Sequence, residues 1–483
     1  MSGLGSTFKK FPKTFWVANT MELFERWAWY GLFTVLALYL TQSTDTGALG
    51  FSQTQKGNIM GIVTAILYLL PLFTGALADK FGYKRMLIIA FVILALSYYL
   101  MGQFRSYAAV YATFLLVALG AAIFKPIISA TVAKTTDETT SSIGFGIFYM
   151  IVNIGGFVGP VFSSKLRHAY GWNIVFVMAA TAIMVNILLV LFFYKEPDRV
   201  KNEDSFAQSI KKSLKNIITA LSDIKLTLFL IIMVGFWTMF NQLFYTLPNF
   251  IDQWVNTEII YNWLNGISPA LASAVGTDEG TIAPEMMVNL DAGFIILFQV
   301  LVSSLVMRFK PINAIISGIV VVSVGIGLSF ATNNGFYTIA GILIFAFGEM
   351  ASSPKFTEYI GRIAPKNKEA LYMGTSFLPV ALGNYFAGLF SGPVYQSVSD
   401  KVTLLKTELA ARGLEVPEIS KTFTQNDFFK KAADMLNTDQ HGLTQMLWDK
   451  YTPYTIWYIF SAIGVATIIA LFLYNRFVLG KAK

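Results

Sequence analysis

Residues 75–85 read Gly75-Ala-Leu-Ala-Asp79-Lys80-Phe-Gly82-Tyr-Lys84-Arg85, and this charged turn between two long apolar segments decides the fold. Gly82 permits a tight turn, because glycine adopts backbone conformations that other residues avoid. The acidic and basic side chains beside it can form a charge network, which nearby helix ends favour. The turn therefore indicates two membrane helices joined on one side of a bilayer. The residues expected to form a cytoplasmic gate are Asp79, Lys80, Lys84 and Arg85.

Composition places the chain among polytopic membrane proteins. Of its 483 residues, 55% are hydrophobic and only 13% are charged, whereas soluble domains carry about 25% charge. The absence of cysteine excludes disulfides and thiolate metal sites. Both histidines, His168 and His441, fall in predicted loops, so we expect no histidine-based catalysis, no metal site and no cofactor. The net charge of +8 needs no nucleic acid to explain it, since cytoplasmic loops are rich in Lys and Arg.

Twelve apolar segments of spanning length predict an all-α membrane protein with two six-helix bundles. The expected spans are 15–41, 57–78, 86–103, 107–133, 143–164, 172–194, 226–250, 287–307, 311–331, 336–354, 369–393 and 453–475. This pattern divides the chain into an N-terminal bundle (1–194), a cytoplasmic linker (195–225) and a C-terminal bundle (226–483). Two such halves with a site near the membrane midplane are a common plan of secondary transporters, although other transporter classes also have twelve spans.

Lysines and arginines predict the orientation, because cytoplasmic loops hold more of them. They put both termini in the cytoplasm and the long loops 251–286 and 394–452 outside. The second loop also reads as a solvated cap with no role in transport. The first apolar run is expected to be a retained span in a multi-pass protein of the cell (inner) membrane. The basic residues counted on the cytoplasmic side include Lys9, Lys10, Lys13, Lys195, Arg199, Lys201, Lys211, Lys212, Lys215, Arg308, Lys310, Arg476, Lys481 and Lys483.

Three charges interrupt the first apolar segment. Glu22, Glu25 and Arg26 fall on one helical face at about 100° per residue. Each charge at mid-membrane costs about 2.5–3.5 kcal/mol on insertion scales. That face must therefore look into a bundle or a wet cavity, and it is a candidate functional site.

Several motifs resemble known families. The turn at 75–85 resembles the cytoplasmic signature of the major facilitator superfamily. The run Glu22-x-x-Glu25-Arg26-x-x-x-Tyr30-Gly31 resembles the proton-dependent oligopeptide transporter family within it. Because further matching stretches lie in both halves, the chain is identified as a divergent member of that family. These stretches are Phe124-Lys125-Pro126, Phe148-Tyr149-x-x-x-Asn153-x-Gly155, Phe236-Trp237 with Gln242, and Gly348-Glu349-x-x-x-Ser353-Pro354.

The resemblance implies a proton-coupled symporter that imports di- and tripeptides by alternating access. A peptide zwitterion needs one anionic and one cationic pole, because desolvated charges must be paired. Glu349 is expected to receive the ammonium group and Lys125 the carboxylate, which would bridge the two halves. The expected sites are Glu22, Glu25, Arg26 and Asp291 for proton coupling, and Tyr30, Tyr68, Lys125, Asn153, Asn241 and Glu349 for substrate binding.

Simpler interpretations of three of these residues stay open. Lys125 could snorkel to a membrane interface. Glu349 could form a structural ion pair with Lys355, and Tyr68 could serve packing alone.

The sequence departs from the family pattern at several positions. Phe33 stands where the family has arginine, and Asn241 where it has glutamate; in the family these two are thought to pair. Ser376 stands where the family has a pocket tryptophan. Asp291 replaces an amide and could take over lost proton or ammonium chemistry, or it could face outside water at a helix end. The linker is too short for the two extra helices of most bacterial members and is expected to hold one amphipathic helix.

Alternative functions follow from these departures. A same-fold transporter could carry a different small solute, such as nitrate, an amino-acid conjugate or a peptide-like compound. A non-transporting membrane receptor is a remote alternative. An enzyme is not expected, since no nucleophile–base pair is identifiable. The expected partners are a small-molecule substrate, protons and the lipid bilayer, and the expected oligomeric state is a monomer.

Overall fold

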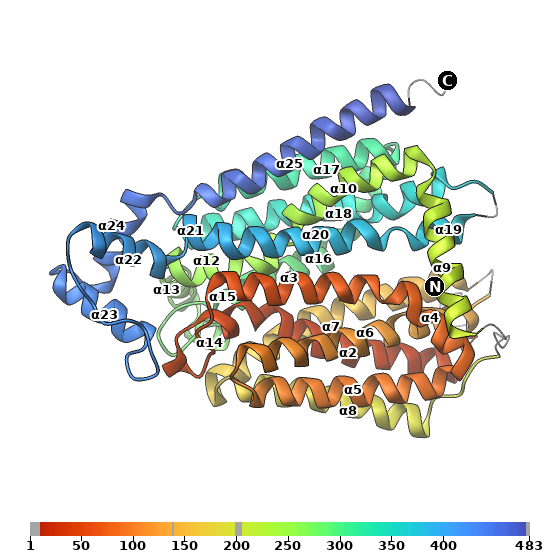
Figure 1. The fold of residues 1–483 in the computed structure, drawn as a ribbon, viewed down its shortest axis with the longest axis horizontal. Helices are drawn as coiled ribbons and strands as arrows, with labels where there is room; N and C mark the ends of the chain where they lie inside the picture. The colour runs from red at the N-terminus through yellow and green to blue at the C-terminus, as the bar shows by residue number, and fades with distance from the viewer. Residues whose placement is uncertain (1–9, 138–139, 199–204, 367, 480–483) are drawn as a thin grey trace. The chain divides into compact units, whose positions relative to one another are not determined.

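The structure is a computed structural model that describes residues 10–137, 140–198, 205–366 and 368–479, and these residues are almost entirely helical (Figure 1). Its first half contains α2 (Lys13–Thr41), α3 (Gln53–Leu69), α4 (Pro71–Phe81), α5 (Tyr83–Gln103), α6 (Tyr107–Lys134), α7 (Ser141–Tyr170), α8 (Asn173–Phe192) and α9 (Phe206–Leu221). The second half begins with α10 (Ile224–Phe240), α11 (Gln242–Tyr245), α12 (Leu247–Trp254), α13 (Glu258–Ile267), α14 (Pro269–Val275), α15 (Pro284–Val288), α16 (Leu290–Val306) and α17 (Pro311–Ser329). It continues with α18 (Gly335–Ile363), α19 (Glu369–Gly374), α20 (Phe377–Leu389), η2 (Phe390–Val394), α21 (Tyr395–Val398), α22 (Lys401–Ala411), α23 (Gln425–Met435), α24 (Gln440–Tyr451) and α25 (Thr455–Tyr474).

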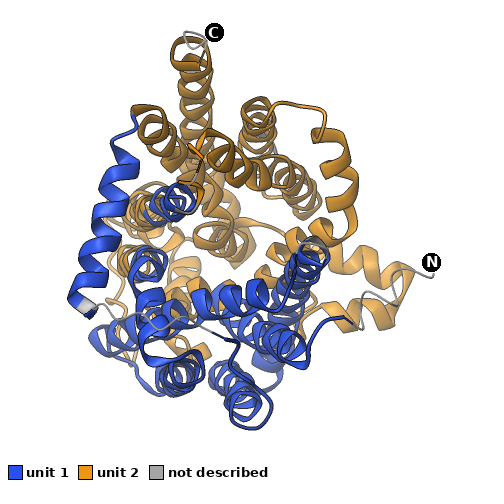
Figure 2. Ribbon diagram, turned by 90° about the vertical axis from the view of Figure 1, so that its right-hand side faces the viewer, with its two compact units in different colours: residues 1–33, 63–223, 370–381 blue, residues 34–62, 224–369, 382–483 orange. Residues whose placement is uncertain are grey.

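The helices form two compact units, which Figure 2 shows in different colours. Unit 1 comprises Met1–Phe33, Val63–Asp223 and Ala370–Ala381, and unit 2 comprises the rest. One end of α2 and one end of α3, together Thr34–Ile62, therefore pack with the C-terminal helices. The division at 194 and 226 expected from the sequence stays a prediction.

Each of the twelve predicted segments contains a helix or a broken pair of helices. Among the described residues, nine helices are long and apolar enough to cross a membrane. The pair α3 and α4 is a tenth when counted as one span, bent by 47°. The remaining two segments are α2, whose apolar run is interrupted by three charges, and the shorter apolar helix α17.

The bend between α3 and α4 lies at Pro71, inside a segment expected to be one span. Proline has no N–H to donate and its ring clashes with the preceding turn, so a kink at this residue is expected. Because of this bend, α4 and the charged turn at its end point in a different direction from α3. Gly82 then ends α4 with φ +100°, a positive φ that glycine adopts more readily than other residues.

Unit 1 brings α2 and α7 into very close contact through glycine. A Cβ added to Gly155 would lie 2.7 Å from Arg26 Cβ and 2.9 Å from the Leu23 carbonyl oxygen. A Cβ added to Gly159, one turn along, would lie 2.9 Å from the Gly31 nitrogen. Small residues at this spacing let membrane helices approach closely. The glycines of α7 therefore fix where the charged face of α2 lies.

Unit 2 is centred on α18, which packs against α16 and α17. A Cβ added to Gly318 of α17 would lie 2.7 Å from the Gly348 carbonyl oxygen. On the other side, Ile295 and Val302 of α16 form an apolar cluster with Ala346 and Met350 of α18, extended by Phe294, Phe298 and Phe347. This packing holds the turn of α18 that carries Glu349 between two apolar helices.

The linker and the long loops are largely helical. One amphipathic helix, α9, occupies the linker as predicted, and Ser205 and Gln208 form a capping box at its start. Loop 394–452 contains α21 to α24. Its centre is Glu408, fully buried, whose carboxylate accepts from Arg412 at 2.6 Å, Lys450 at 2.6 Å and Tyr451 at 2.8 Å. The segment is therefore a folded cap held by one buried carboxylate.

Two expectations need correction or lie outside the structure. The histidines do not lie in loops: His168 is in the last turn of α7 and His441 is in α24. The sequence analysis placed both histidines in loops because the polar ends of these helices show no periodic pattern of apolar residues. Five of the basic residues counted for orientation, Lys9, Arg199, Lys201, Lys481 and Lys483, lie outside the described residues.

We predict that Gly155→Ala destabilises the protein whereas Gly146→Ala in the same helix does not. Both changes improve helix propensity by about 1 kcal/mol, but nothing lies within 4 Å of a Cβ at Gly146. Overpacking at Gly155 should cost about 1–3 kcal/mol. The apparent Tm of the purified variants is the measurement, and equal Tm values for both would contradict the α2–α7 contact.

Candidate functional site

The charged face of α2 forms a buried cluster in unit 1. Glu25 is 0% exposed, Glu22 5% and Arg26 7%. Arg26 Nε donates to Glu25 Oε2 at 2.6 Å and lies 3.2 Å from Glu22 Oε1, while its Nη2 also lies against Glu25. One arginine thus bridges two carboxylates, which leaves an excess of one negative charge when both are ionised. A second cation nearby would balance the cluster.

Lys125 of α6 is that second cation. Its Nζ lies 4.6 Å from the centre of the Tyr68 ring of α3, a distance at which a ring attracts a cation. Lys125 also interacts electrostatically with Glu22, Glu25 and Arg26. The structure therefore brings α2, α3 and α6 together around two carboxylates and two cations. It also places Lys125 over an aromatic ring, whereas snorkelling would take it towards an interface.

The other two predicted residues of unit 1 have different surroundings. Tyr30 lies one turn from Arg26, whose guanidinium is 5.8 Å from the ring centre. Asn153 of α7 donates through Nδ2 to the Tyr149 carbonyl of its own helix at 2.8 Å. The part of its motif that reaches α2 is Gly155, through close packing.

The turn motif is tied to the end of α8 through a residue that the motif does not contain. Glu196 accepts from the backbone nitrogens of Tyr83 at 2.9 Å and Lys84 at 3.3 Å. A carboxylate at a helix N-terminus is favourable because it meets unpaired N–H groups. Asp79 accepts from the Tyr83 hydroxyl at 3.2 Å, and Lys84 Nζ donates to the Leu191 carbonyl at 3.1 Å.

Roles of the individual gate residues stay predictions. Arg85 is exposed on α5. Lys80 Nζ lies 5.9 Å from the centre of the Phe81 ring. The charge network expected from the sequence therefore includes one carboxylate, Glu196, from outside the motif.

Unit 2 brings Asp291 and Glu349 together. Asp291, in the first turn of α16, is 6% exposed, so it does not face outside water. Its carboxyl group lies close enough to that of Glu349 on α18 for the two to interact. Lys355, the structural partner considered for Glu349, instead pairs with Glu358 at 2.7 Å. Asn241 is buried and donates to the Trp237 carbonyl of its own helix at 2.8 Å.

Lys56 of α3 is a buried cation that the sequence analysis did not identify. It is 0% exposed, and its Nζ donates to the Tyr245 carbonyl oxygen of α11 at 2.9 Å. The Tyr395 ring centre lies 5.3 Å away. The Tyr245 hydroxyl in turn lies 3.0 Å from the Met60 carbonyl oxygen and 2.9 Å from Asn384 Oδ1. Lys56 thus ties the start of α3 to the helices that follow residue 240.

Next to Lys56, α3 crosses α20 and η2 without side chains between the backbones. A Cβ added to Gly61 would lie 2.8 Å from Gly388 Cα, and one added to Gly57 would lie 2.7 Å from Gly392 Cα. Four glycines therefore make this contact. Lys56 stands where it can fasten the contact with a charged hydrogen bond.

The positions where the family's ion pair is lost have apolar or local solutions. Phe33 stacks on Trp29 of the same helix with ring centres 4.9 Å apart. Trp29 in turn lies 6.2 Å from Phe114 of α6. Gln242 donates to the Thr238 carbonyl at 3.0 Å and accepts from Thr246 at 2.5 Å. At the second position of the lost pair, Asn241 is uncharged and donates to the Trp237 carbonyl at 2.8 Å. Neither position therefore leaves a buried charge unpaired.

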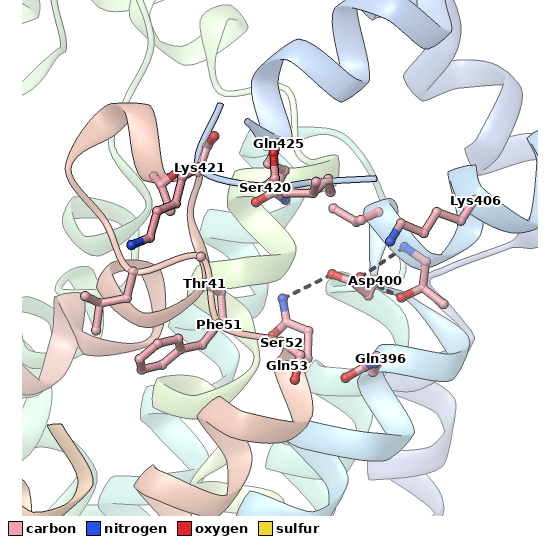
Figure 3. Close-up of a pocket in the computed structure, with 17 residues that line it drawn as sticks. Thr41, Phe51, Ser52, Gln53, Gln396, Asp400, Lys406, Ser420, Lys421 and Gln425 are labelled. Carbon is pink, nitrogen blue, oxygen red and sulfur yellow. Dashed lines mark hydrogen bonds between the residues drawn. The ribbon is translucent and has the colours of Figure 1, made fainter. Parts of the chain in front are cut away.

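A cavity of about 650 Å³ lies in unit 2 between the start of α3, α22 and the 419–425 stretch (Figure 3). Gln53 donates to Asp400 at 3.2 Å at its edge, as Figure 3 shows. Two lysines, Lys406 and Lys421, are among its lining residues. None of the site residues predicted from the sequence lines it.

The sequence pattern described as Major Facilitator Superfamily matches residues 20–277, more than half of the chain. The chain belongs to the Major Facilitator Superfamily. This assigns it to a transporter family and not to an enzyme family, and it agrees with the fold class expected from the sequence.

Individual relatives in this superfamily are distant. The chain is 28% identical over 241 residues to the dipeptide and tripeptide permease A of Pectobacterium carotovorum subsp. carotovorum (strain PC1), which covers 49% of the chain and 45% of the permease. It is 26% identical over 241 residues to the permease A of Escherichia coli (strain K12), covering 49% and 46%. The chain thus spans about half the length of the curated relatives it matches.

A solved structure matches along the whole chain. A crystal structure of the peptide transporter POT in complex with sulfate superposes with a TM-score of 0.70 at 16% identity, covering 97% of this chain and 94% of that one. This likeness confirms the major facilitator fold of an all-helical membrane protein.

We predict that Lys56→Met loosens the glycine crossing of this superfamily member. The change removes a charged donor from a buried carbonyl, which costs about 1–3 kcal/mol. Because the chain has no cysteine, a single cysteine at Ser391, fully buried in η2, reports access. A maleimide should label that cysteine about fivefold faster or more in the Lys56→Met background.

The matched control is Lys430→Met, an exposed lysine of α23 in the same unit. Its labelling rate should equal that of the parent. Equal rates in all three proteins would mean that Lys56 does not hold the crossing.

Proposed function

We propose that this protein is a proton-coupled symporter that imports di- and tripeptides by alternating access. The observation that carries the proposal is the position of Lys125 within electrostatic reach of the buried Glu22–Glu25–Arg26 cluster, all at motif positions. Lys125 is half-buried and lies over the Tyr68 ring, and the carboxylates of the cluster bond to Arg26, so Lys125 is available for a substrate carboxylate. Intramembrane charges of this kind mark substrate and proton pathways.

Each pole of a peptide zwitterion has a proposed partner in this chain. Lys125 of unit 1 is the proposed partner of the carboxylate, with Tyr30, Tyr68 and Asn153 as polar neighbours. Glu349 of unit 2 is the proposed partner of the ammonium group, and Asn241 lies in the same unit. Curated relatives named dipeptide and tripeptide permease A, distant as they are, support this substrate class.

The glutamates on α2 suit proton coupling. Burial favours the neutral form of a carboxyl group, whereas a neighbouring cation favours the charged form. A substrate carboxylate that engages Lys125 or Arg26 would weaken their hold on Glu22 and Glu25. Each proton that enters is driven by about 2.3 kcal/mol per 100 mV of membrane potential. We also propose a monomer in the cell membrane with both termini in the cytoplasm.

A second candidate substrate is another small solute. Phe33 and Asn241 replace the residues of the family's ion pair, and Ser376 replaces its pocket tryptophan. A solved structure of a POT family transporter in complex with 5-aminolevulinic acid matches this chain with a TM-score of 0.68 at 16% identity, covering 99% of this chain and 100% of that one. That ligand also carries one amine and one carboxylate. A purely anionic solute such as nitrate has no use for Glu349, so dependence on Glu349 separates purely anionic solutes from those that carry an amine, peptides included.

We predict that labelled dialanine enters proteoliposomes under an inward proton gradient and that Lys125→Ala and Glu349→Gln each abolish this uptake. Removing one partner of a buried charge pair costs about 2–5 kcal/mol, so uptake should fall at least about thirtyfold. The exposed Lys430→Ala variant is the control and should keep parent activity.

The outcomes separate the candidates. Uptake of an anionic solute that needs Lys125 but not Glu349 would favour the second substrate class. No uptake of either kind by folded protein would overturn the transport proposal for both classes.

A further prediction concerns the proton. Glu22→Gln keeps the shape of the side chain but removes a proton-carrying carboxyl group next to Arg26. Exchange of labelled for unlabelled dialanine across the membrane should persist, while accumulation driven by a pH gradient should fall several-fold. Unchanged accumulation would exclude Glu22 from coupling.

A further inference from the structure

Two carboxyl groups of unit 2, that of the buried Asp291 and that of the half-buried Glu349, lie at the contact of α16 and α18. Asp291 begins α16, and Glu349 lies in the middle of α18. Both helices are long and apolar enough to span a membrane. The apolar cluster of Ile295, Ala346 and Met350 lies directly along this contact. Water is therefore poorly placed to solvate both groups as anions.

A hydrogen bond between two carboxyl groups requires a proton on one of them, because an ionised carboxylate only accepts. Asp291 and Glu349 lie close enough to interact in this way. Two carboxylates this close cannot both ionise without a strong penalty. The arrangement therefore favours the form in which the two groups hold one proton between them and carry one negative charge.

The neighbouring elements do not supply a cation that could replace this proton. On α18, Lys355 and Arg362 both pair with Glu358, at 2.7 Å and 2.6 Å. The helix α17 has no ionisable residue, and Asp291 is the only one on α16. The packed helices α13 and α15 add Glu258, Tyr261 and Glu285, none of which is basic. Tyr337 and Tyr359 are the remaining ionisable residues of α18.

Each carboxyl group also has an oxygen left over. Asp291 Oδ1 and Glu349 Oε2 are buried and accept no hydrogen bond within the described part of the chain. Buried acceptors without partners are costly and point to a donor that arrives from elsewhere. An ammonium group carries three N–H donors and fits this need, whereas a carboxylate or a phosphate does not.

We propose that Asp291 and Glu349 form a proton-sharing pair that becomes neutral when it holds one proton and one substrate ammonium group. This rests on the proposed function, and it assigns a proton-coupling step to the amine end of the substrate. With the proton on Asp291 and the ammonium on Glu349, the loaded pair has no net charge. A neutral pair is the cheapest to seal away from water, because burying an unpaired charge costs several kcal/mol. Occlusion of the ammonium-loaded pair therefore requires the proton as well.

The pH dependence follows with a definite sign. As pH rises through the titration of the pair, the proton leaves and the ammonium-loaded pair keeps one negative charge. Occlusion then becomes costly, and substrate exchange slows. In Asp291→Asn, Glu349 and the ammonium neutralise each other without a proton. Exchange should then become independent of pH, and coupling to the proton gradient should be lost.

The test compares wild type, Asp291→Asn and Glu418→Gln in proteoliposomes, where Glu418 is an exposed control. Exchange of dialanine by Asp291→Asn should stay within about threefold of wild type at low pH and exceed it at high pH. Accumulation driven by a pH gradient should vanish in Asp291→Asn and persist in Glu418→Gln. Unchanged accumulation and pH dependence in Asp291→Asn would overturn the proposal.

A second readout needs no transport and separates this proposal from the proposed function. Infrared spectra of the purified protein report protonated carboxyl groups directly. Asp291→Asn and Glu349→Gln should each remove or shift one protonated-carboxyl band that Glu418→Gln leaves in place. If wild type does not transport dialanine, the proposed function fails, and this band alone decides whether the pair holds a proton. An unaltered band in both variants would overturn the pair.

Discussion

The structure depends on one constraint, that a charge taken into an apolar helical bundle must meet its counter-charge there. Arg26 satisfies it by contacting two glutamates of its own helix. One negative charge of the two glutamates remains, and Lys125 of α6 interacts electrostatically with it. Because the balance needs α2 close to its neighbours, Gly155 and Gly159 of α7 carry no side chain. The charged face of α2 therefore requires glycine on α7, although α7 has no charged residue at this contact.

The same constraint is met differently in the two units. In unit 1, carboxylates are balanced by side-chain cations. In unit 2, Asp291 and Glu349 are proposed to share a proton instead, and Lys56 uses a backbone carbonyl and an aromatic ring. A protein that replaces ion pairs by protons and carbonyl dipoles lowers the number of fixed charges it must bury. This explains how the family's arginine and glutamate could both be lost, at Phe33 and Asn241, without leaving an orphan charge.

The sequence predicted the features that follow directly from the free-energy cost of placing polar groups in a membrane. Twelve apolar segments and the charges on α2 are visible because deviations from apolarity are expensive in a membrane. Lys56 escaped prediction because a lysine normally ends an apolar run, so the expected span began at residue 57. Its signal was the glycine pair at 57 and 61, which indicates a close helix contact beside it. The pairing of Asp291 with Glu349 needed the packing of α16 on α18, which no local pattern contains.

The crossing of α3 with α20 and η2 has a thermodynamic consequence. Its four glycines present backbone to backbone, so separating the helices there exposes little apolar side-chain surface. The heat-capacity change of a transition follows the apolar surface it exposes. Opening at this crossing is therefore expected to have a small heat-capacity change. The enthalpy of opening should then be nearly constant with temperature, unlike that of a contact built from interlocking leucines.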